Sequence, residues 1–410
     1  MFFFPVPLTI MLEKLLNHSL WEDYLKINLD NEYLSKKEKK KLQDFISNKK
    51  YLEIASRIIS NDYTFSIPKK HIISKISTSK KRIVYTYNEI EMMMFKYITF
   101  LLYDYDYLFT PNLYSFRRNT GVKNAIYRLK KDYNLRNMYG YKVDISNYFN
   151  SIDPVILLSK LKDNVDNDLY DLFKLLLLDK RVCFKNEIIE ENKGVMAGVP
   201  ISSFLANFYI KDIDKYFYDN KIKYYRYADD IIMFASSRDE LDKNINILYS
   251  FFSEYNLNIN HDKEYFFSPN ERIEFLGFSF DNGVCDLSQN IVNKIKGKIR
   301  RSARGYRRYM FKKGLDEKTI IKALIRKYNA KFFGRNNNEL SWKYWYFPLI
   351  NTARSLQIID NYFQEYLRYI ATGRHNKRNY SIVPYQALKE LGYRSLVHEY
   401  YLFLNMENKV

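Results

Sequence analysis

Two adjacent carboxylates, Asp229 and Asp230, interrupt the stretch YYRYADDIIMFASS between two apolar runs typical of β-strands. Adjacent aspartates commonly form turns, so the pair alone indicates no more than a solvated turn. A third acid, Asp144, ends another strand-like run, YKVDI, where a lone carboxylate is costly unless it is paired or lies in a cleft. If the two strands pack side by side, three carboxylates meet at one place.

Such a cluster predicts a site for divalent metal. Neighbouring carboxylates raise each other's pKa, and a hard cation that prefers oxygen ligands relieves their repulsion. Two Mg²⁺ ions held by shared carboxylates suit in-line phosphoryl transfer, because one activates the attacking oxygen and the other stabilises the leaving group. The acids therefore predict phosphoryl-transfer chemistry with Mg²⁺ as cofactor.

Strand and helix patterns interleave around these acids. Between Tyr63 and Asn88, β-branched and aromatic residues flank a basic turn, SKISTSKK, which predicts a hairpin with a positive tip. A second hairpin is expected around IEFLGFSF, and Pro154 suits the first turn of a helix. Further helices are expected from about Glu89, through VKNAIYRLKKDY, after the turn GVMAGVP, over 239–257 and, as a charged N-terminal extension, within residues 1 to about 60.

A basic helix is expected from Ile291 onward. Ten basic residues and no acid lie between Lys294 and Lys313, which favours contact with a nucleic-acid backbone over a merely solvated basic face. Residues on the expected apolar seam recur every three or four positions: Ile291, Ile295, Ile299, Ser302, Tyr306 and Met310.

The overall composition agrees with a polyanionic partner. Lysine and arginine number 66 against 47 acids, giving a formal charge of +19, and nucleic acid is favoured over an acidic membrane surface. The 39 tyrosines can stack on bases, although a compositional bias explains them better. Only Cys183 and Cys285 occur, without zinc-ligand spacing, and the apolar opening MFFFPVPLTIML is too short to span a bilayer. We expect a soluble, cytoplasmic protein with no membrane partner.

Several motifs together resemble those of reverse transcriptases. VDISNYFNSI, AGVPISSFLAN, YRYADD, NLNINHDK and FLGFSF follow the order of the palm motifs, and PKK, KKRIVY and PNLYSFR resemble finger motifs upstream. The resemblance covers roughly residues 63 to 285. It implies an α+β right-hand polymerase with fingers, a palm with an antiparallel sheet and a helical thumb. The expected domains are an N-terminal helical extension (1–62), fingers and palm (63–285), a helical thumb (286–372) and a C-terminal helical cap (373–410).

The resemblance also assigns roles at the acids. It makes Asp144 and Asp229 metal ligands, adds Ile145 to the metal site, and makes Asp230 the third acid beside the primer end. Lys263 resembles the lysine that protonates departing pyrophosphate, although a bare lysine in a polar loop is otherwise a surface residue.

Around the nucleotide, Phe149 resembles the bulky residue under the sugar that excludes a 2′-hydroxyl, whereas spacing alone favours a core aromatic. Tyr227 would lie against primer or template. Lys70, with Lys69 as an equally good match, and Arg82 resemble finger residues that hold the triphosphate. The remaining matches are Arg117, in a motif with Ser115 in place of glycine, Gly198 and Pro200 in a turn beside the nascent base pair, and Gly277 in a primer-gripping hairpin.

One position departs from the pattern. Ala197 stands where many relatives have glutamine, which removes a contact near the nascent base pair and bears on fidelity or template preference. The metal chemistry does not depend on it.

Within the family, the chain most resembles stand-alone bacterial enzymes of the defence-associated, unknown-group kind, which are related to group II intron and retron enzymes. That resemblance implies a noncoding RNA template, nascent cDNA, deoxynucleoside triphosphates and a role against phage. Two alternatives stay open. One is a template-independent or protein-primed polymerase, and the other is an RNA-binding maturase or scaffold with an idle palm.

Overall fold

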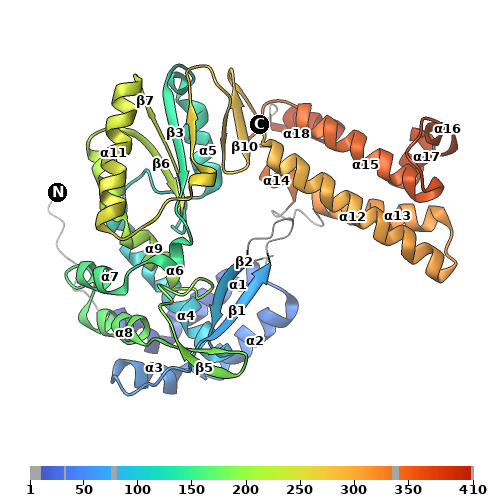
Figure 1. The fold of residues 1–410 in the computed structure, drawn as a ribbon. Helices are drawn as coiled ribbons and strands as arrows, with labels where there is room; N and C mark the ends of the chain where they lie inside the picture. Colours follow the sequence, from blue (N-terminus) through green and yellow to red (C-terminus); the bar gives the residue numbers. More distant parts are fainter. Residues whose placement is uncertain (1–10, 32–33, 75–80, 335–340, 408–410) are drawn as a thin grey trace. The chain divides into compact units, whose positions relative to one another are not determined.

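The computed structural model describes residues 11–31, 34–74, 81–334 and 341–407 (Figure 1). Two compact units divide the chain: Met1–Ala125 with Met138–Phe266, and Ile126–Asn137 with Phe267–Val410. This division does not coincide with the expected domain limits, because residues 267–285 belong to the second unit. The fold class is α+β, as predicted. Among the described helices, none is both long and apolar enough to cross a membrane.

Asp144 and Asp230 lie on a four-stranded sheet of the first unit, with the strand order β6-β7-β3-β8, and Asp229 lies in the turn between β6 and β7. β6 and β7 form the predicted hairpin, and β3 pairs antiparallel with β7. β7 is buried from Ile231 to Ala235, as an apolar strand in the middle of a sheet should be. Helix α11 packs on β3 and β7 (Figure 1). The bounds are β3 Tyr139–Asp144, β6 Lys223–Tyr227, β7 Asp230–Ala235, α11 Arg238–Glu254, η4 His261–Lys263 and β8 Tyr265–Phe267.

A second sheet of this unit, in the order β2-β1-β4-β5, contains the basic hairpin predicted from the sequence. Its strands β1 and β2 are antiparallel, and Lys70 lies opposite Tyr85. The predicted positive tip falls mostly on residues 75–80, which are outside the described residues. The bounds are β1 Lys69–Ser74, β2 Lys81–Thr86, β4 Arg181–Phe184 and β5 Glu187–Glu190.

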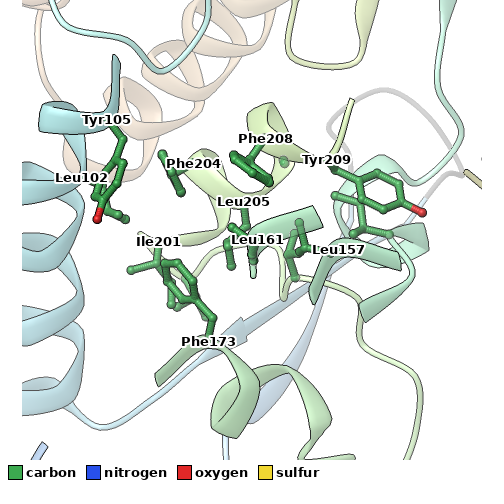
Figure 2. Packing of buried hydrophobic residues seen from close by; sticks show 14 of the residues in the cluster. Leu102, Tyr105, Leu157, Leu161, Phe173, Ile201, Phe204, Leu205, Phe208 and Tyr209 are labelled. Atoms are coloured by element: carbon green, nitrogen blue, oxygen red, sulfur yellow. The ribbon is translucent and has the colours of Figure 1, made fainter. Parts of the chain in front are cut away.

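Helix α9 is buried in the apolar core of the first unit, where it contacts α6, α7 and α10. Its Phe204 and Phe208 lie in an apolar cluster with Leu157 and Phe173 of the neighbouring helices (Figure 2). The neighbouring helix α7 begins at Pro154, and the side chain of Asp153 accepts the backbone N–H groups at its N-terminus, which confirms the predicted helix start. The bounds are α6 Tyr148–Ser151, α7 Pro154–Leu161, α8 Asn167–Leu178, α9 Ser202–Tyr209 and α10 Lys211–Asp219.

The N-terminal helices share this unit's core. The fully buried indole of Trp21 stacks on the ring of Tyr97, with centroids 3.5 Å apart, and on that of Tyr51 at 4.5 Å. Burial of three large aromatic side chains fixes these helices against α4. The bounds are η1 Met11–Leu16, α1 His18–Asp30, α2 Lys36–Ser47, α3 Tyr51–Ile59, α4 Glu89–Leu101 and η2 Leu102–Leu108.

The second unit contains a three-stranded sheet, in the order β11-β10-β9, and a group of long helices. Helix α12 packs on α13 and α15 (Figure 1). Of its predicted seam, Ile295, Ile299 and Met310 are buried, whereas Ile291, Ser302 and Tyr306 are half-buried and Val292 and Ala303 occupy the core. The bounds are α5 Val122–Lys131 (which starts in the first unit), η3 Tyr133–Asn137, β9 Ile273–Phe275, β10 Phe278–Asp281, β11 Val284–Leu287, α12 Gln289–Lys313, α13 Glu317–Phe333, α14 Trp342–Trp345, α15 Arg354–Thr372, α16 Asn379–Ile382, α17 Tyr385–Glu390 and α18 Leu396–Glu407.

Candidate active site

The structure brings the three predicted acids together at one end of the sheet. Asp144, the last residue of β3, lies directly opposite Asp230, the first residue of β7. Side chains of such antiparallel partners share one face, with Cβ atoms roughly 4.5–5.5 Å apart. Asp229 lies in the two-residue turn before β7, and its carbonyl accepts the N–H of Ile145 across 3.2 Å. Strand pairing therefore joins carboxylates that are far apart in the sequence.

The turn that carries Asp229 has an unusual backbone. Tyr227 pairs with Asp230, which leaves Ala228 and Asp229 as the connecting residues. Ala228 has a φ of 56°, in the left-handed region that favours glycine. An alanine persists there only when its surroundings hold the backbone in place.

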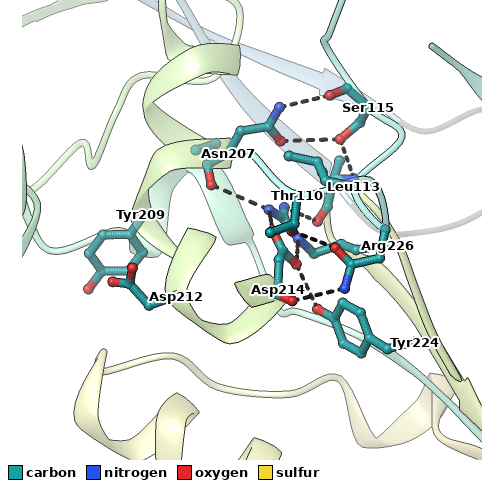
Figure 3. A network of polar contacts seen from close by, with 12 residues as sticks. Thr110, Leu113, Ser115, Asn207, Tyr209, Asp212, Asp214, Tyr224 and Arg226 are labelled. Carbon is teal, nitrogen blue, oxygen red and sulfur yellow. Dashed lines mark hydrogen bonds and ion pairs between the residues drawn. The ribbon is translucent and has the colours of Figure 1, made fainter. Parts of the chain in front are cut away.

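A buried polar network supplies that support (Figure 3). Ser115 Oγ accepts the N–H of Ala228 across 2.7 Å, and Arg226 Nη1 donates to the carbonyl of Ala228 across 3.1 Å. Asn207 joins the network, because its Nδ2 donates to the carbonyl of Ser115 across 2.7 Å and its own carbonyl accepts from Arg226. Both polar groups of the left-handed residue are thus satisfied inside the protein.

Arg226 is fully buried, and its charge is compensated by Asp214. The guanidinium donates to both carboxylate oxygens, with Nε 2.7 Å from Oδ1, and the hydroxyl of Tyr224 donates to Oδ1 across 3.1 Å (Figure 3). Although burial lowers the pKa of Arg226, the attraction of Asp214 outweighs burial and leaves the pKa above its ordinary value. The arginine therefore stays charged beneath the turn. Neither Arg226 nor Asp214 was singled out from the sequence, although Arg226 lies within the YRYADD motif.

The acids themselves are poorly solvated. Burial, followed by the charges of Asp144 and Asp230, raises the pKa of Asp229 to about 6. Burial also raises the pKa of Asp230, although the nearby Lys142 opposes this shift. A cation bound beside these carboxylates would lower their free energy by relieving the repulsion among them.

Lys263 lies at the acids and not on an unrelated surface. It ends the short helix η4, and its Nζ donates to Asp144 Oδ2 across 2.5 Å. The N–H of Asn260 donates to the carbonyl of Asp144 across 2.8 Å, which anchors the segment to the end of β3. The predicted lysine and the predicted acid are therefore direct partners.

The donor set suits a divalent cation that shares its ligands with a substrate. Within the described ranges, no group of three or more His, Cys, Asp or Glu side chains is arranged so that it could hold a metal ion by itself. Mg²⁺ commonly uses one or two protein carboxylates together with substrate phosphates and water, so a closed protein cage is not required. The pairing of Asp144 with Asp230, and the pKa of Asp229 raised by burial and by the charges of both, fit a site of this shared kind.

Three aromatic rings lie next to one another near the acids. Phe149, on α6, contacts the edge of Phe116 with centroids 6.1 Å apart, and Phe116 lies 6.5 Å from Tyr227. Phe116 is 42% exposed and has a φ of 52°, a strained conformation for a bulky residue. The sequence interpretation missed Phe116, although it belongs to the YSFR motif from which Arg117 was chosen.

The predicted glycine turn packs against β2. The N–H of Tyr85 donates to the carbonyl of Ala197 across 2.8 Å, and Asn150 Oδ1 accepts the N–H of Ala197. Gly198 has a φ of 102°, and a Cβ there would lie 3.0 Å from the carbonyl oxygen of Tyr85. Glycine is therefore required at this position, and Pro200 follows it just before α9.

Strand register separates the basic residues that were expected to act together. Lys69, His71 and Ile73 share one face of β1, and Arg82 lies opposite Ile73 on that face. Lys70 points to the other face, where it forms an ion pair with Glu191. The structure therefore brings Lys69 and Arg82, but not Lys70 and Arg82, to one face of the hairpin.

Glu191 links Lys70 to the sheet, since the hydroxyl of Tyr85 donates to Glu191 Oε1 across 2.7 Å. Arg117 is likewise engaged within the protein. Its Nε and Nη2 donate to the two carboxylate oxygens of Asp106 at 2.8 and 2.9 Å, and Nη1 donates to the carbonyl of Thr110. Most of its guanidinium donors therefore already have partners within the protein.

In the second unit, the predicted Gly277 occupies the turn between β9 and β10, the hairpin expected around FLGF. Its φ of 87° follows a φ of 48° at Leu276, so both turn residues are left-handed. A Cβ on Gly277 would lie 3.1 Å from the side chain of Ile291.

Residues 67–280, more than half of the chain, match the family model described as reverse transcriptase (RNA-dependent DNA polymerase). The retron Ec83 reverse transcriptase of Escherichia coli is 35% identical over 111 residues, which cover 25% of this chain and 34% of that relative. The chain thus spans about a third of the length of this curated relative.

Two solved structures are also similar over part of their length. The apo telomerase of Candida tropicalis, truncated from its C-terminal domain, has a TM-score of 0.44 and 14% identity, with 55% of each chain covered. The telomerase of Candida albicans in complex with a TWJ fragment of telomeric RNA has a TM-score of 0.44 and 10% identity, with 88% of this chain and 70% of that chain covered.

Proposed function

Because the chain belongs to the reverse transcriptase family, we propose that it polymerises deoxynucleotides on an RNA template at the site formed by Asp144, Asp229 and Asp230. The observation that carries this proposal is the register of β3 and β7, which sets Asp144 opposite Asp230 with Asp229 in the adjoining turn. An idle palm has no need to keep three poorly solvated acids together, since their burial and repulsion cost stability.

Asp144 and Asp229 would hold divalent metal, with Asp230 as the third acid and the backbone of Ile145 beside them. When bound, two Mg²⁺ ions would activate the primer 3′-hydroxyl and stabilise the charge on the leaving pyrophosphate. The protein's own contribution is to hold the carboxylates in place. The contacts of Ser115 and Arg226 with Ala228 support that role.

Lys263 is proposed to give a proton to the departing pyrophosphate. The primer 3′-hydroxyl loses its proton to solvent as its oxygen bonds to the α-phosphorus of the nucleotide. The bond from that phosphorus to the pyrophosphate oxygen breaks, and this oxygen then requires a proton. The position of Lys263 Nζ, 2.5 Å from Asp144 Oδ2, supports this role because the ammonium lies beside the proposed metal ligands.

Phe149 is proposed to favour deoxynucleotides over ribonucleotides. Its ring is half-buried and contacts the edge of Phe116. A ring fixed in this way leaves little room for an additional 2′-hydroxyl, so steric exclusion would discriminate between the two sugars.

The template is proposed to be a noncoding RNA, and the cDNA is proposed to act in defence against phage. Similarity to a retron reverse transcriptase over 111 residues supports the bacterial class of the enzyme. The template and the defence role rest on the resemblance to stand-alone bacterial enzymes.

The test is to purify the protein from cells that carry its genomic neighbourhood and to sequence the bound RNA and DNA. Asp229→Asn with Asp230→Asn serves as the inactive variant, because asparagine preserves size while removing charge. Asp239→Asn with Glu254→Gln is the control, since both residues are exposed on helix α11. The proposal is supported if one RNA and its complementary DNA are recovered from the unmodified protein and the control, and only the DNA is missing from the inactive variant.

Other results point elsewhere. RNA without DNA from the unmodified protein would favour an RNA-binding scaffold. DNA unrelated to any bound RNA, or DNA covalently attached to a tyrosine, would favour untemplated or protein-primed synthesis.

A further inference from the structure

Glu264, which follows Lys263 at the end of η4, accepts hydrogen bonds from two tyrosines. The hydroxyl of Tyr141 donates to its Oε1 across 2.6 Å, and the hydroxyl of Tyr249 donates to the same oxygen. The two hydroxyl oxygens lie 2.8 Å apart. His261 Nδ1 lies 2.7 Å from Oε2, so both oxygens of the Glu264 carboxylate have partners.

These contacts join three elements of the first unit. Tyr141 belongs to β3, and Tyr249 belongs to α11, the helix that packs on β3. Tyr141 is fully buried, so its hydroxyl requires a hydrogen-bond partner inside the protein. Glu264 accepts from this hydroxyl and thereby connects the end of η4 both to the sheet and to the helix that covers it.

Lys263 and Glu264 contact opposite faces of β3. Successive side chains of a strand point to opposite faces, so Tyr141 lies on one face and Asp144, three residues later, lies on the other. Lys263 Nζ donates to Asp144 Oδ2 across 2.5 Å, whereas Glu264 contacts Tyr141. The backbone at Glu264 is extended, with φ −66° and ψ 133°, which suits neighbouring side chains that point apart. The end of β3 therefore lies between the two side chains.

The carboxylate of Glu264 is ionised and well fixed. Burial acts to raise its pKa, but the hydrogen bonds from Tyr141, Tyr249 and His261 outweigh burial and leave the pKa below its ordinary value. The side chain of Glu264 is 16% exposed, whereas that of Lys263 is 48% exposed. Packing therefore restricts Glu264 much more than the long side chain of Lys263, which has many rotamers available.

We propose that Glu264 is a positioning residue, which holds Lys263 beside Asp144 by anchoring η4 to Tyr141 and Tyr249. The inference rests on the proposed role of Lys263 in giving a proton to pyrophosphate. In a simpler interpretation, Glu264 only satisfies the buried hydroxyl of Tyr141. The two roles differ in one consequence, because a positioning residue affects incorporation only while Lys263 is present, whereas a purely structural residue acts with or without it.

The test is a double-mutant cycle in the full-length protein. Glu264→Ala is introduced into the unmodified protein and into Lys263→Gln, and single-turnover incorporation is measured over a range of deoxynucleotide concentrations. Glu254→Ala, at an exposed position of α11, is the control and should change the rate about twofold or less.

Glu264→Ala should lower the maximal rate of incorporation about tenfold in the unmodified protein, because a displaced Lys263 donates its proton less often. The nucleotide concentration that gives half this rate should change about twofold or less. In Lys263→Gln, the same substitution should change the rate about twofold or less. Equal loss of rate in the two backgrounds, or no loss in the unmodified protein, would overturn the proposal.

Two further variants keep the test decisive if Glu264→Ala fails to fold. Glu264→Gln retains a carbonyl oxygen that accepts from both tyrosines, so its rate should stay within about threefold of the unmodified rate. Tyr249→Phe removes one of the two donors and should lower the rate about threefold, but only in the presence of Lys263. The same loss from Tyr249→Phe in Lys263→Gln, or no loss in either protein, would overturn the proposal.

A second measurement does not require polymerase activity. Acylation of lysines in the metal-free protein is followed by mass spectrometry, with the exposed Lys243 of α11 as the internal reference. An ammonium held against a carboxylate reacts slowly with the reagent, so Glu264→Ala should raise the acylation rate of Lys263 about threefold relative to that of Lys243. The Glu254→Ala control should leave this ratio unchanged. An unchanged ratio in Glu264→Ala would overturn the proposal.

The two measurements separate this inference from the proposed function. An unmodified protein that extends no DNA primer on an RNA template, but whose Lys263 is acylated faster in Glu264→Ala, would contradict the proposed function and leave the anchoring of Lys263 standing. A protein that extends primers, and whose Lys263 is acylated at the same rate in Glu264→Ala, would do the reverse.

Discussion

Lys263 Nζ lies 2.5 Å from Asp144 Oδ2, although the two residues are 119 positions apart in the sequence. The contact places a cation on one of the proposed metal ligands and relieves part of the repulsion among the acids. An ammonium beside the proposed metal ligands would be suited to proton donation if the substrate phosphates bind there.

Lys263→Gln should lower the rate of single-nucleotide incorporation by about 10²-fold, the usual range for loss of a general acid. Lys263→Arg keeps the positive charge but releases a proton poorly. This variant should therefore bind RNA as the unmodified protein does, but it should not recover the rate of incorporation. Pre-steady-state incorporation over a range of pH measures this. An unchanged rate for Lys263→Gln would contradict the assignment.

Asp229→Asn should stabilise the metal-free protein, and more at pH 7.5 than at pH 5. The pKa of Asp229 is raised from 3.8 to about 6 in the folded protein. Between pH 3.8 and about 6 the folded state therefore binds more protons than the unfolded state, and stability falls as the pH rises through this range. The substitution should raise the free energy of unfolding by about 1–3 kcal/mol above pH 6 and by much less near pH 4. Chemical denaturation with EDTA at several pH values measures it.

Added Mg²⁺ should raise the Tm of the unmodified protein more than that of Asp229→Asn, and so reverse the order of stability of the two proteins. The same Mg²⁺ response in both proteins would argue against Asp229 as a ligand.

Ser115→Ala should cost about 1–3 kcal/mol of stability, because it leaves the buried N–H of Ala228 without its acceptor. The turn that carries Asp229 should loosen, so incorporation should slow about tenfold even below the unfolding temperature. Ser159→Ala, an exposed helical serine, is the control. Loss of stability with an unchanged incorporation rate would limit Ser115 to a structural role.

Phe149→Ala should raise incorporation of ribonucleotides relative to deoxynucleotides, on the order of 10- to 100-fold, because space for a 2′-hydroxyl is opened. Phe116→Ala should produce a smaller change in the same direction, since it removes the ring that contacts Phe149. The ratio of kcat/KM for matched nucleotide pairs measures both. An unchanged ratio for Phe149→Ala would show that Phe149 is a core aromatic with no part in sugar discrimination.

Lys69→Gln should raise the KM for deoxynucleotides about tenfold with little change in Tm, because Lys69 shares a face with Arg82 and a charged hydrogen bond contributes about 1.5 kcal/mol. Lys70→Gln should instead lower Tm, since it leaves Glu191 without its cation. The reverse pattern would show that Lys70 holds the triphosphate despite the strand register.

Ordered motifs made the acids, the hairpins and the α+β class predictable, because strand and helix periodicities are local properties of the sequence. The contacts of Ser115 with Ala228 and of Arg226 with Asp214 could not be predicted, since each joins elements whose pairing depends on the folded core. The sequence likewise could not decide whether Lys70 or Lys69 shares a strand face with Arg82. Adjacent residues of a strand face opposite sides, and only the register decides which side meets Arg82.

The stacking of Trp21 between Tyr51 and Tyr97 bears on how the protein can be shortened. A fragment cut at the first recognisable motif, near residue 63, would lose α1 to α3 and strip the covering rings from one side of Tyr97. The exposed aromatic surface would promote aggregation during expression. A fragment that keeps this aromatic core intact must therefore begin upstream of Trp21.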